Sequence, residues 1–184
     1  MLSISIMAHK DRADYLPLLV KQLGKANIFV DDGTLGAPGN AIQCWKNFNK
    51  KAKYHLVIQD DAILTEDFLS KVKTYLRGQE IISFYTGNRV LTKTKTEKQK
   101  DFYKSNELIG AVALAIRTDI IPEMLRFFKS KNIKGDDRRI KLFAKSKNFP
   151  IYYTRPSLVN HRVGNWSIWQ NKETKKGRQA VNFK

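Results

Sequence analysis

Residues 54–61 read Tyr-His-Leu-Val-Ile-Gln-Asp-Asp, an apolar run that leads directly into two adjacent carboxylates. The run is short and rich in β-branched and aliphatic side chains, which predicts a strand over Tyr54–Gln59. Runs of the same type lie on both sides of it. They predict further strands over Leu2–Met7, Asn27–Asp31, Glu80–Tyr85, Gly110–Arg117 and Pro150–Thr154.

Helix-like periodicity separates the first strands. It covers Ala13–Leu23 and Asn40–Ala52, and a third helix is expected to begin at a cap on Thr65 and to stop at Gly78. Strands that alternate with helices build a mostly parallel sheet with helices on both faces, so we predict one α/β domain. We expect this domain to span residues 1–170, with a basic tail over 171–184, and Arg89–Lys104 to form a loop or lid.

The composition is that of a globular chain of 184 residues, with 42% hydrophobic residues and a net charge of +17. No apolar stretch is long enough to predict a membrane span. The first residues are typical of a strand rather than a leader, and the single cysteine, Cys44, fits a reducing cytoplasm. Residues 126–184 carry +13 of the charge, which favours a polyanionic partner such as nucleic acid; a solvated basic face is the alternative.

Two predicted strands end in paired aspartates, Asp31-Asp32 and Asp60-Asp61. Ligands bind outside the carboxyl ends of strands in open α/β sheets, and adjacent carboxylates are costly unless a cation or a hydroxyl-rich ligand lies beside them. Oxygen ligands of this kind suit Mg²⁺ or Mn²⁺. The alternative interpretation is that these aspartates only cap turns.

A third acidic pair, Asp136-Asp137, lies in the most basic part of the chain. It is either a general base for an incoming hydroxyl group or the N-cap of a helix that follows. Among the histidines, His161 is a candidate metal ligand, His9 a candidate nucleotide contact, and His55 is expected to be structural.

The order of these motifs resembles a GT-A type glycosyltransferase, the nucleotide-sugar-dependent fold with a carboxylate metal motif, over roughly residues 2–167. Five pieces carry the resemblance. They are the first strand with Met7-Ala8-His9-Lys10-Asp11-Arg12, then Val30-Asp31-Asp32-Gly33, the Asp60-Asp61 motif, Gly110–Arg117, and Pro156-Ser157-Leu158-Val159-Asn160-His161.

The resemblance implies a single GT-A-like domain that uses a nucleotide-sugar, with UDP as the expected nucleotide, together with Mn²⁺ or Mg²⁺. It places Asp61 and His161 on the metal and either Asp136 or Asp137 as the base. The donor would contact Ala8, His9, Arg12, Asp31 or Asp32, Gln59 and Asp60. Asn40 and Trp45 are further candidates to line its pocket, although core packing is the expected role of Trp45. Gln59 stands where the family often has its first carboxylate, which leaves the role of Asp60 open.

The basic C-terminal third bears on the acceptor. Small transferases that this chain resembles occur in viruses of bacteria, where some glycosylate hydroxymethylated bases in DNA, which implies DNA as acceptor in a host cytoplasm. The expected nucleic-acid contacts are Arg138, Arg139, Lys141, Lys145 and Arg162, with Trp166, Trp169 or Tyr103 stacking on bases. A bacterial surface glycan as acceptor, or a non-catalytic nucleic-acid-binding module on this scaffold, are the alternatives.

Overall fold

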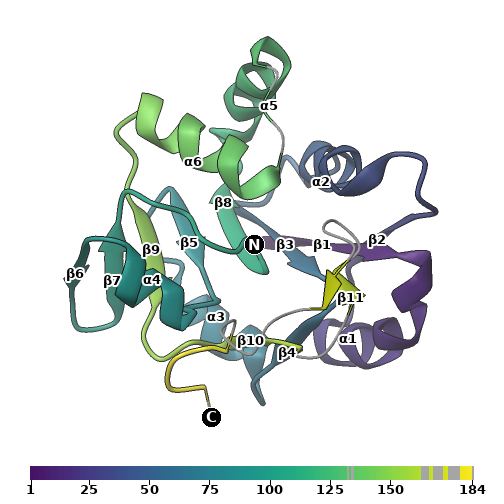
Figure 1. The fold of residues 1–184 in the computed structure, drawn as a ribbon, viewed down its shortest axis with the longest axis horizontal. Helices are drawn as coiled ribbons and strands as arrows, with labels where there is room; N and C mark the ends of the chain where they lie inside the picture. Colours follow the sequence, from purple (N-terminus) through teal and green to yellow (C-terminus); the bar gives the residue numbers. More distant parts are fainter. Residues whose placement is uncertain (132, 134, 163–165, 168–171, 174–178, 184) are drawn as a thin grey trace.

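An eight-stranded sheet forms the centre of the computed structural model, which describes residues 1–131, 133, 135–162, 166–167, 172–173 and 179–183 (Figure 1). The strand order is β2-β1-β3-β8-β5-β9-β7-β6. Six of these strands run in one direction, and β8 and β7 run against them, so the sheet is mostly parallel as predicted. The strands are β1 (Leu2–His9), β2 (Asn27–Asp31), β3 (Tyr54–Gln59), β5 (Ile81–Ser83), β6 (Thr96–Lys98), β7 (Phe102–Ser105), β8 (Ala113–Arg117) and β9 (Ile151–Thr154).

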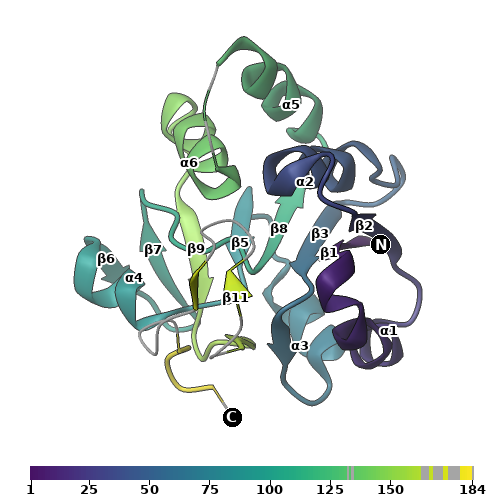
Figure 2. The same cartoon turned by 45° about the vertical axis from the view of Figure 1, so that its right-hand side comes forward.

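Helices cover both faces of this sheet (Figures 1 and 2). Helices α1 (Leu16–Leu23) and α3 (Phe68–Tyr75) pack on one face, where they meet Ile6, Leu56 and Ile58. Helices α2 (Gly36–Lys46), α5 (Ile121–Ser130) and α6 (Asp136–Ser146) pack on the other, where Val57 points. Successive residues of a strand face opposite sides, so β3, which is buried from Tyr54 to Ile58, supplies both cores.

Smaller elements complete the fold. A 3-10 helix, η1 (Lys10–Tyr15), follows β1, and α4 (Asn88–Lys93) precedes β6. Strand β4 (Ala62–Leu64) pairs antiparallel with β10 (Val159–His161), opposing Ala62 to His161, and β11 (Trp166–Ser167) pairs with β12 (Lys172–Glu173). The β4–β10 pair therefore carries the end of the chain back to the Asp60-Asp61 motif.

Three predictions of local structure were wrong in their bounds. Helix α2 starts and ends earlier than predicted, because the chain turns after Lys46 and the Asn49 N–H donates to the Ser3 hydroxyl of β1. Helix α3 starts after Asp67 rather than at Thr65, whose N–H is taken by the Leu158 carbonyl. Residues 89–104 form α4 and the β6–β7 hairpin rather than a loop, since lysine-rich segments are common on edge strands.

The described part of the C-terminal segment packs back onto the domain. The Val181 N–H donates to the Thr86 carbonyl at 2.7 Å, and the Ala180 N–H donates to Asn160 Oδ1 at 2.9 Å. Within the described residues, no helix combines the length and the apolar composition needed to cross a bilayer.

Candidate active site

A cleft with a cavity volume of about 470 Å³ opens at the carboxyl ends of β1, β2 and β3. It is lined on one side by η1 and α2 and on the other by the start of α4 and the first turn of α6. A volume of this size suits a small organic ligand. From the predicted site, the cleft brings together Ala8, His9, Arg12, Asp31, Asn40, Gln59, Asp60, Asp61, Asp136, Asp137, Arg138, Lys141 and His161.

Asp60 and Asp61 lie at the floor of the cleft, and both are buried. The Arg12 guanidinium bridges them, since Nη1 donates to Asp60 Oδ1 at 2.8 Å and to Asp61 Oδ2 at 2.6 Å. The His9 backbone N–H donates to Asp60 Oδ2 at 2.8 Å. Burial raises the pKa of Asp60 to about 6 although Arg12 opposes it. Burial also raises the pKa of Asp61, but His161 and Arg12 outweigh it and the pKa is lowered.

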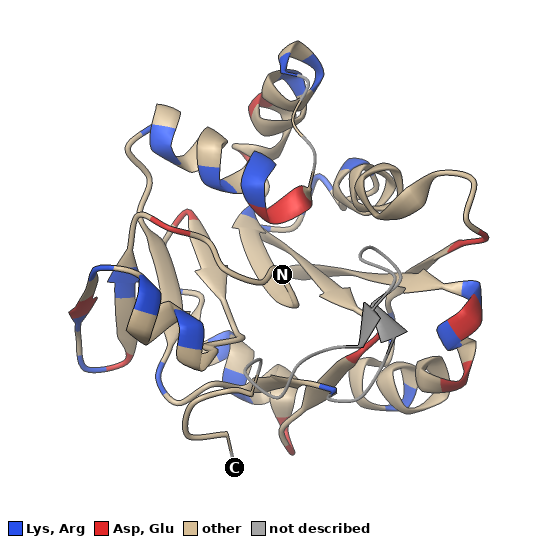
Figure 3. Ribbon diagram, in the orientation of Figure 1, with Lys and Arg blue, Asp and Glu red and all other residues tan. Residues whose placement is uncertain are grey.

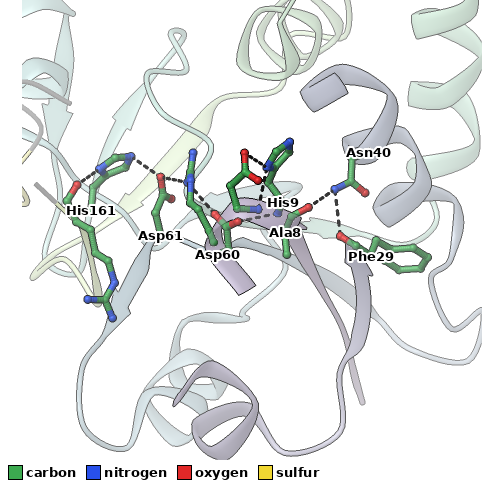
Figure 4. A network of polar contacts seen from close by, with 10 residues as sticks. Ala8, His9, Phe29, Asn40, Asp60, Asp61 and His161 are labelled. Carbon is green, nitrogen blue, oxygen red and sulfur yellow. Dashed lines mark hydrogen bonds and ion pairs between the residues drawn. The ribbon is translucent and has the colours of Figure 1, made fainter. Parts of the chain in front are cut away.

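His161 faces Asp61 from β10, with Nε2 3.2 Å from Asp61 Oδ2 (Figure 4). Its Nδ1 lies 2.7 Å from the Arg162 carbonyl oxygen, which accepts only if Nδ1 carries a proton. Nε2 then either donates a second proton to Asp61 or presents a lone pair to a cation shared with it. A backbone carbonyl that fixes the tautomer in this way is typical of a histidine that binds a metal.

The Asp61–His161 pair fits part of a divalent cation site. Asp61 Oδ1 is buried and has no hydrogen-bond partner among the described residues, so this carboxylate oxygen is available to bind a cation. No group of three or more His, Cys, Asp or Glu side chains that could hold a metal occurs in the described part of the chain. Mg²⁺ and Mn²⁺ commonly complete such a site with water and with the phosphates of a substrate.

Bonds to the backbone build the part of the cleft that leads into α2. Asp31 Oδ1 accepts from the N–H groups of Gly33 and Leu35, both at 3.1 Å, and so shapes the turn before this helix. The Asn40 amide donates to the carbonyls of Ala8 at 2.8 Å and Phe29 at 3.0 Å, tying α2 to β1 and β2. Figure 4 shows the Asn40 bonds near the Asp60-Asp61 pair. Asp31 and Asn40 therefore hold this wall of the cleft in place.

Asp136 and Asp137 line the cleft from the first turn of α6, next to α2, whose Trp45 interacts with Asp136. The N-cap position belongs to Gly135 and no side chain caps the helix, so the N-cap interpretation of the pair was wrong. Asp137 Oδ2 accepts from the Gly110 N–H at 3.2 Å. Burial and the neighbouring Asp137 charge raise the pKa of Asp136 to about 7, against smaller opposite effects of Trp45 and Arg139. Asp136 can therefore exchange a proton near neutral pH.

Tyr85 lies between His161 and the segment around Gly110. Its ring is buried, and its centroid lies 6.5 Å from that of His161. A Cβ atom at Gly87 would lie 2.5 Å from Tyr85 Oη, and one at Gly110 would lie 3.1 Å from Tyr85 Cε1. Both positions are therefore restricted to glycine while Tyr85 keeps this place. Tyr85 thus contacts the segment whose Gly110 amide holds Asp137.

Sequence reasoning missed Tyr85, Gly87 and Arg89 as cleft residues. Tyr85 ends the predicted strand 80–85, so the rule that selected Asp31 and Asp60 could also have selected it. Arg89 was hidden in the segment expected to be a loop.

Other predicted residues lie away from the cleft. Asp32 is exposed and accepts from the Thr34 N–H, and Lys145 pairs with Glu107, which also holds Lys141 at 3.1 Å. Further predicted nucleic-acid contacts engage neighbours within the chain. Arg139 donates to the Ile133 carbonyl at 2.6 Å, Arg162 lies 4.5 Å from the Tyr15 ring centroid, and Arg155 lies 5.9 Å from that of Tyr103. The Trp166 side chain and the whole of Trp169 lie outside the described residues.

No protein-family model and no curated protein sequence matches the chain. Several solved structures are similar to the chain in fold. A mutant of Drosophila β1,4-galactosyltransferase 7 in complex with manganese, UDP-Gal and xylobiose superposes with a TM-score of 0.52 at 7% identity, covering 100% of this chain and 81% of that one. The chain has the fold of nucleotide-sugar transferases.

The same fold serves other proteins. The 2-C-methyl-D-erythritol 4-phosphate cytidylyltransferase from Thermus thermophilus superposes with a TM-score of 0.52 at 11% identity, over 98% of this chain and 92% of that one. Protein A197 from STIV superposes with a TM-score of 0.51 at 15% identity, over 100% and 98%. At these identities the likeness is one of fold, and the chemistry has to be argued from the cleft.

Proposed function

We propose that this protein is a metal-dependent glycosyltransferase that moves a sugar from a UDP-sugar to a hydroxyl group on a hydroxymethylated base in DNA. The observation that carries the proposal is the composition of one cleft. A buried carboxylate–histidine pair lies on its floor, the residues proposed to contact the donor line it from β1, β2 and α2, and a carboxyl group with a pKa near 7 lines it from the first turn of α6.

In the proposed reaction Asp61 and His161 hold the divalent cation, which would neutralise the charge that develops on the leaving diphosphate. Asp136 or Asp137 takes the proton of the acceptor hydroxyl. The acceptor oxygen forms a bond to the anomeric carbon of the sugar while the bond from that carbon to the diphosphate oxygen breaks. Asp31, Asn40 and Ala8 position the nucleotide in this scheme.

The charge of the cleft mouth supports a polyanionic acceptor. Arg89 on α4 and Arg138 on α6 both line the cleft and are exposed. Figure 3 shows basic residues along α4 and α6, with the acidic pair at the start of α6. Phosphate groups of DNA beside these helices would place a base near Asp137.

A nucleotide-release assay tests the reaction. Purified protein is incubated with UDP- and GDP-sugars, Mn²⁺, and DNA that contains either ordinary or hydroxymethylated pyrimidines, and the digested DNA is analysed by mass spectrometry. We expect nucleotide release and a sugar-sized mass gain only on hydroxymethylated DNA. Transfer to another acceptor would remove the DNA part of the proposal, and pyrophosphate release from a nucleoside triphosphate would replace glycosyl transfer by nucleotidyl transfer.

DNA contact has its own test, in which salt-dependent binding is compared among variants. Arg138→Gln should weaken DNA binding and lower the slope of log affinity against log salt by about 1. Arg139→Gln should leave that slope unchanged, because Arg139 donates to the Ile133 carbonyl and lies near the Phe128 ring. Equal slopes for Arg138→Gln and the wild type would contradict a phosphate contact at Arg138.

A further inference from the structure

Arg12 occupies Asp61, the carboxylate to which the proposed function assigns the metal, together with the adjacent Asp60. Its Nη1 lies 2.6 Å from Asp61 Oδ2 and 2.8 Å from Asp60 Oδ1, so one nitrogen atom bridges the pair. The Arg12 side chain is 15% exposed, and those of Asp60 and Asp61 are 5% and 7% exposed. A partly buried guanidinium within the chain thus offsets one carboxylate charge of the pair.

The contact involves the oxygen that a bound cation would share. Asp61 Oδ2 also faces His161 Nε2 at 3.2 Å, so a divalent cation between Asp61 and His161 would lie beside the guanidinium. Positive charges a few ångströms apart in a buried site repel each other strongly. Arg12 therefore opposes metal binding for as long as it stays on Asp61.

Arg12 is placed to leave Asp61 and form an ion pair with an anionic ligand bound in the same cleft. It lies in η1, at a residue whose φ of −127° and ψ of 19° interrupt the helix, and it lines the cleft on the donor side. Its Nε is buried and has no hydrogen-bond partner among the described residues. A guanidinium matches the paired oxygens of a diphosphate, and movement of Arg12 away from Asp61 would expose its unpartnered Nε–H to such a ligand.

We propose that Arg12 is a positioning residue that must leave Asp61 for the donor diphosphate before the metal site is complete. This inference rests on the proposed function, because it takes Asp61 and His161 as metal ligands. The diphosphate draws Arg12 away and adds its own oxygens, so the donor strengthens metal binding. By linkage, the metal strengthens donor binding by the same factor.

Metal binding to the intact protein tests this inference without any measurement of turnover. Free Mn²⁺ is followed by electron paramagnetic resonance during titration of the protein, with and without UDP, and Mn²⁺–UDP association is subtracted from a protein-free blank. For the wild type we expect UDP to increase the Mn²⁺ affinity about tenfold or more, a coupling of about 1.4 kcal/mol.

Variants at position 12 separate the effect of charge from that of shape. Arg12→Gln should bind Mn²⁺ about tenfold more tightly than the wild type without UDP, and UDP should increase that affinity far less. Arg12→Lys retains the charge and should restore weak Mn²⁺ binding in the absence of UDP. The matched control, Arg77→Gln, removes an arginine that pairs with Asp101 far from the cleft, and should behave as the wild type.

The outcomes distinguish failure of the metal assignment to Asp61 and His161 from failure of the Arg12 inference. If the wild type binds Mn²⁺ equally well with and without UDP, and Asp61→Ala abolishes that binding, the metal site stands and the Arg12 inference is overturned. If neither wild type nor Arg12→Gln binds Mn²⁺ under any condition, the metal assignment fails and the inference fails with it. Because the diphosphate adds its own oxygens in every variant, a gain in the wild type that equals the gain in Arg12→Gln would also overturn the Arg12 inference. If Arg12→Gln does not fold, Arg12→Met, which also removes the charge, takes its place in this comparison.

Discussion

Replacement of Asp136 by asparagine should stabilise the protein at alkaline pH. Burial and the adjacent Asp137 charge raise the pKa of Asp136 from 3.8 to about 7 in the folded state. A carboxyl group with this shift keeps its proton in the folded chain between about pH 4 and pH 7, where the unfolded chain has lost it. The folded state binds more protons over this range, so the free energy of unfolding falls as the pH rises and then levels off above pH 7.

The magnitude follows from the size of the shift. Three pKa units at about 1.4 kcal/mol each amount to about 4 kcal/mol as an upper limit. Asp136 is half-buried, although its Oδ1 atom is fully buried, so relaxation and water at the cleft side reduce the effect. We therefore expect Asp136→Asn to gain roughly 2 kcal/mol of stability relative to the wild type between pH 4.5 and pH 8.

Urea denaturation at pH 4.5, 6, 7 and 8, followed by circular dichroism, measures this difference. Other titrating groups are common to both proteins and cancel when the two are subtracted. Asp119→Asn is the matched control with the opposite sign, because Arg117 lowers the pKa of the exposed Asp119 and its neutralisation should destabilise the protein slightly as the pH rises. A stability difference between Asp136→Asn and the wild type that stays constant from pH 4.5 to pH 8 would refute the reasoning.

Three further predictions follow from single side chains. Asp61→Ala should lower the Mn²⁺-dependent turnover rate about 100-fold or more. Its DNA affinity, measured by filter binding, should be unchanged. A turnover rate that neither the substitution nor removal of the metal alters would contradict the assigned role. Burial lowers the pKa of His55 to about 4, so stability should be lost as the pH falls from 6.5 to 4, by up to about 3 kcal/mol; denaturation of His55→Gln should show a flatter pH dependence. Gly87→Ala should lower the free energy of unfolding by about 1–3 kcal/mol, since its Cβ would collide with Tyr85 and its φ of −79° excludes backbone strain as the cause; a thermal midpoint equal to that of the wild type would show that Tyr85 moves freely.

Most strands of the central sheet were predictable because each is a short apolar run, and all but β2, whose Ile28 and Val30 are exposed, are largely buried. Tyr54–Gln59 is buried along nearly its whole length and was predicted with the observed bounds. Segment 89–104 was not predictable from its composition, because β6 and β7 gain their hydrogen bonds from each other and from β9 rather than from an apolar pattern. Long-range pairing of this kind leaves little trace in a local window of sequence.

The candidate site was partly predictable for a similar reason. Residues that directly follow a strand, such as Asp31, Asp60 and Asp61, meet at one edge of the sheet by geometry. Contacts that depend on the direction of a side chain could not be predicted from the sequence. The bridge from Arg12 to both carboxylates requires the folded positions of segments far apart in sequence. The bond from Arg139 to the Ile133 carbonyl is local, but it depends on the path of the chain into α6.

The two aspartate pairs of the cleft differ in their surroundings, and this difference accounts for a division of labour in the proposed reaction. Asp61 lies between the Arg12 guanidinium and the His161 ring, and its pKa is lowered, so it stays ionised and suits a cation. Asp136 is half-buried beside a second carboxylate, and its pKa is raised to about 7. Carboxylates in one cleft whose environments push their pKa values apart are suited to different tasks. The ion binding and the proton transfer that we propose would therefore use two environments of one cleft, Asp61 for the cation and Asp136 for the proton.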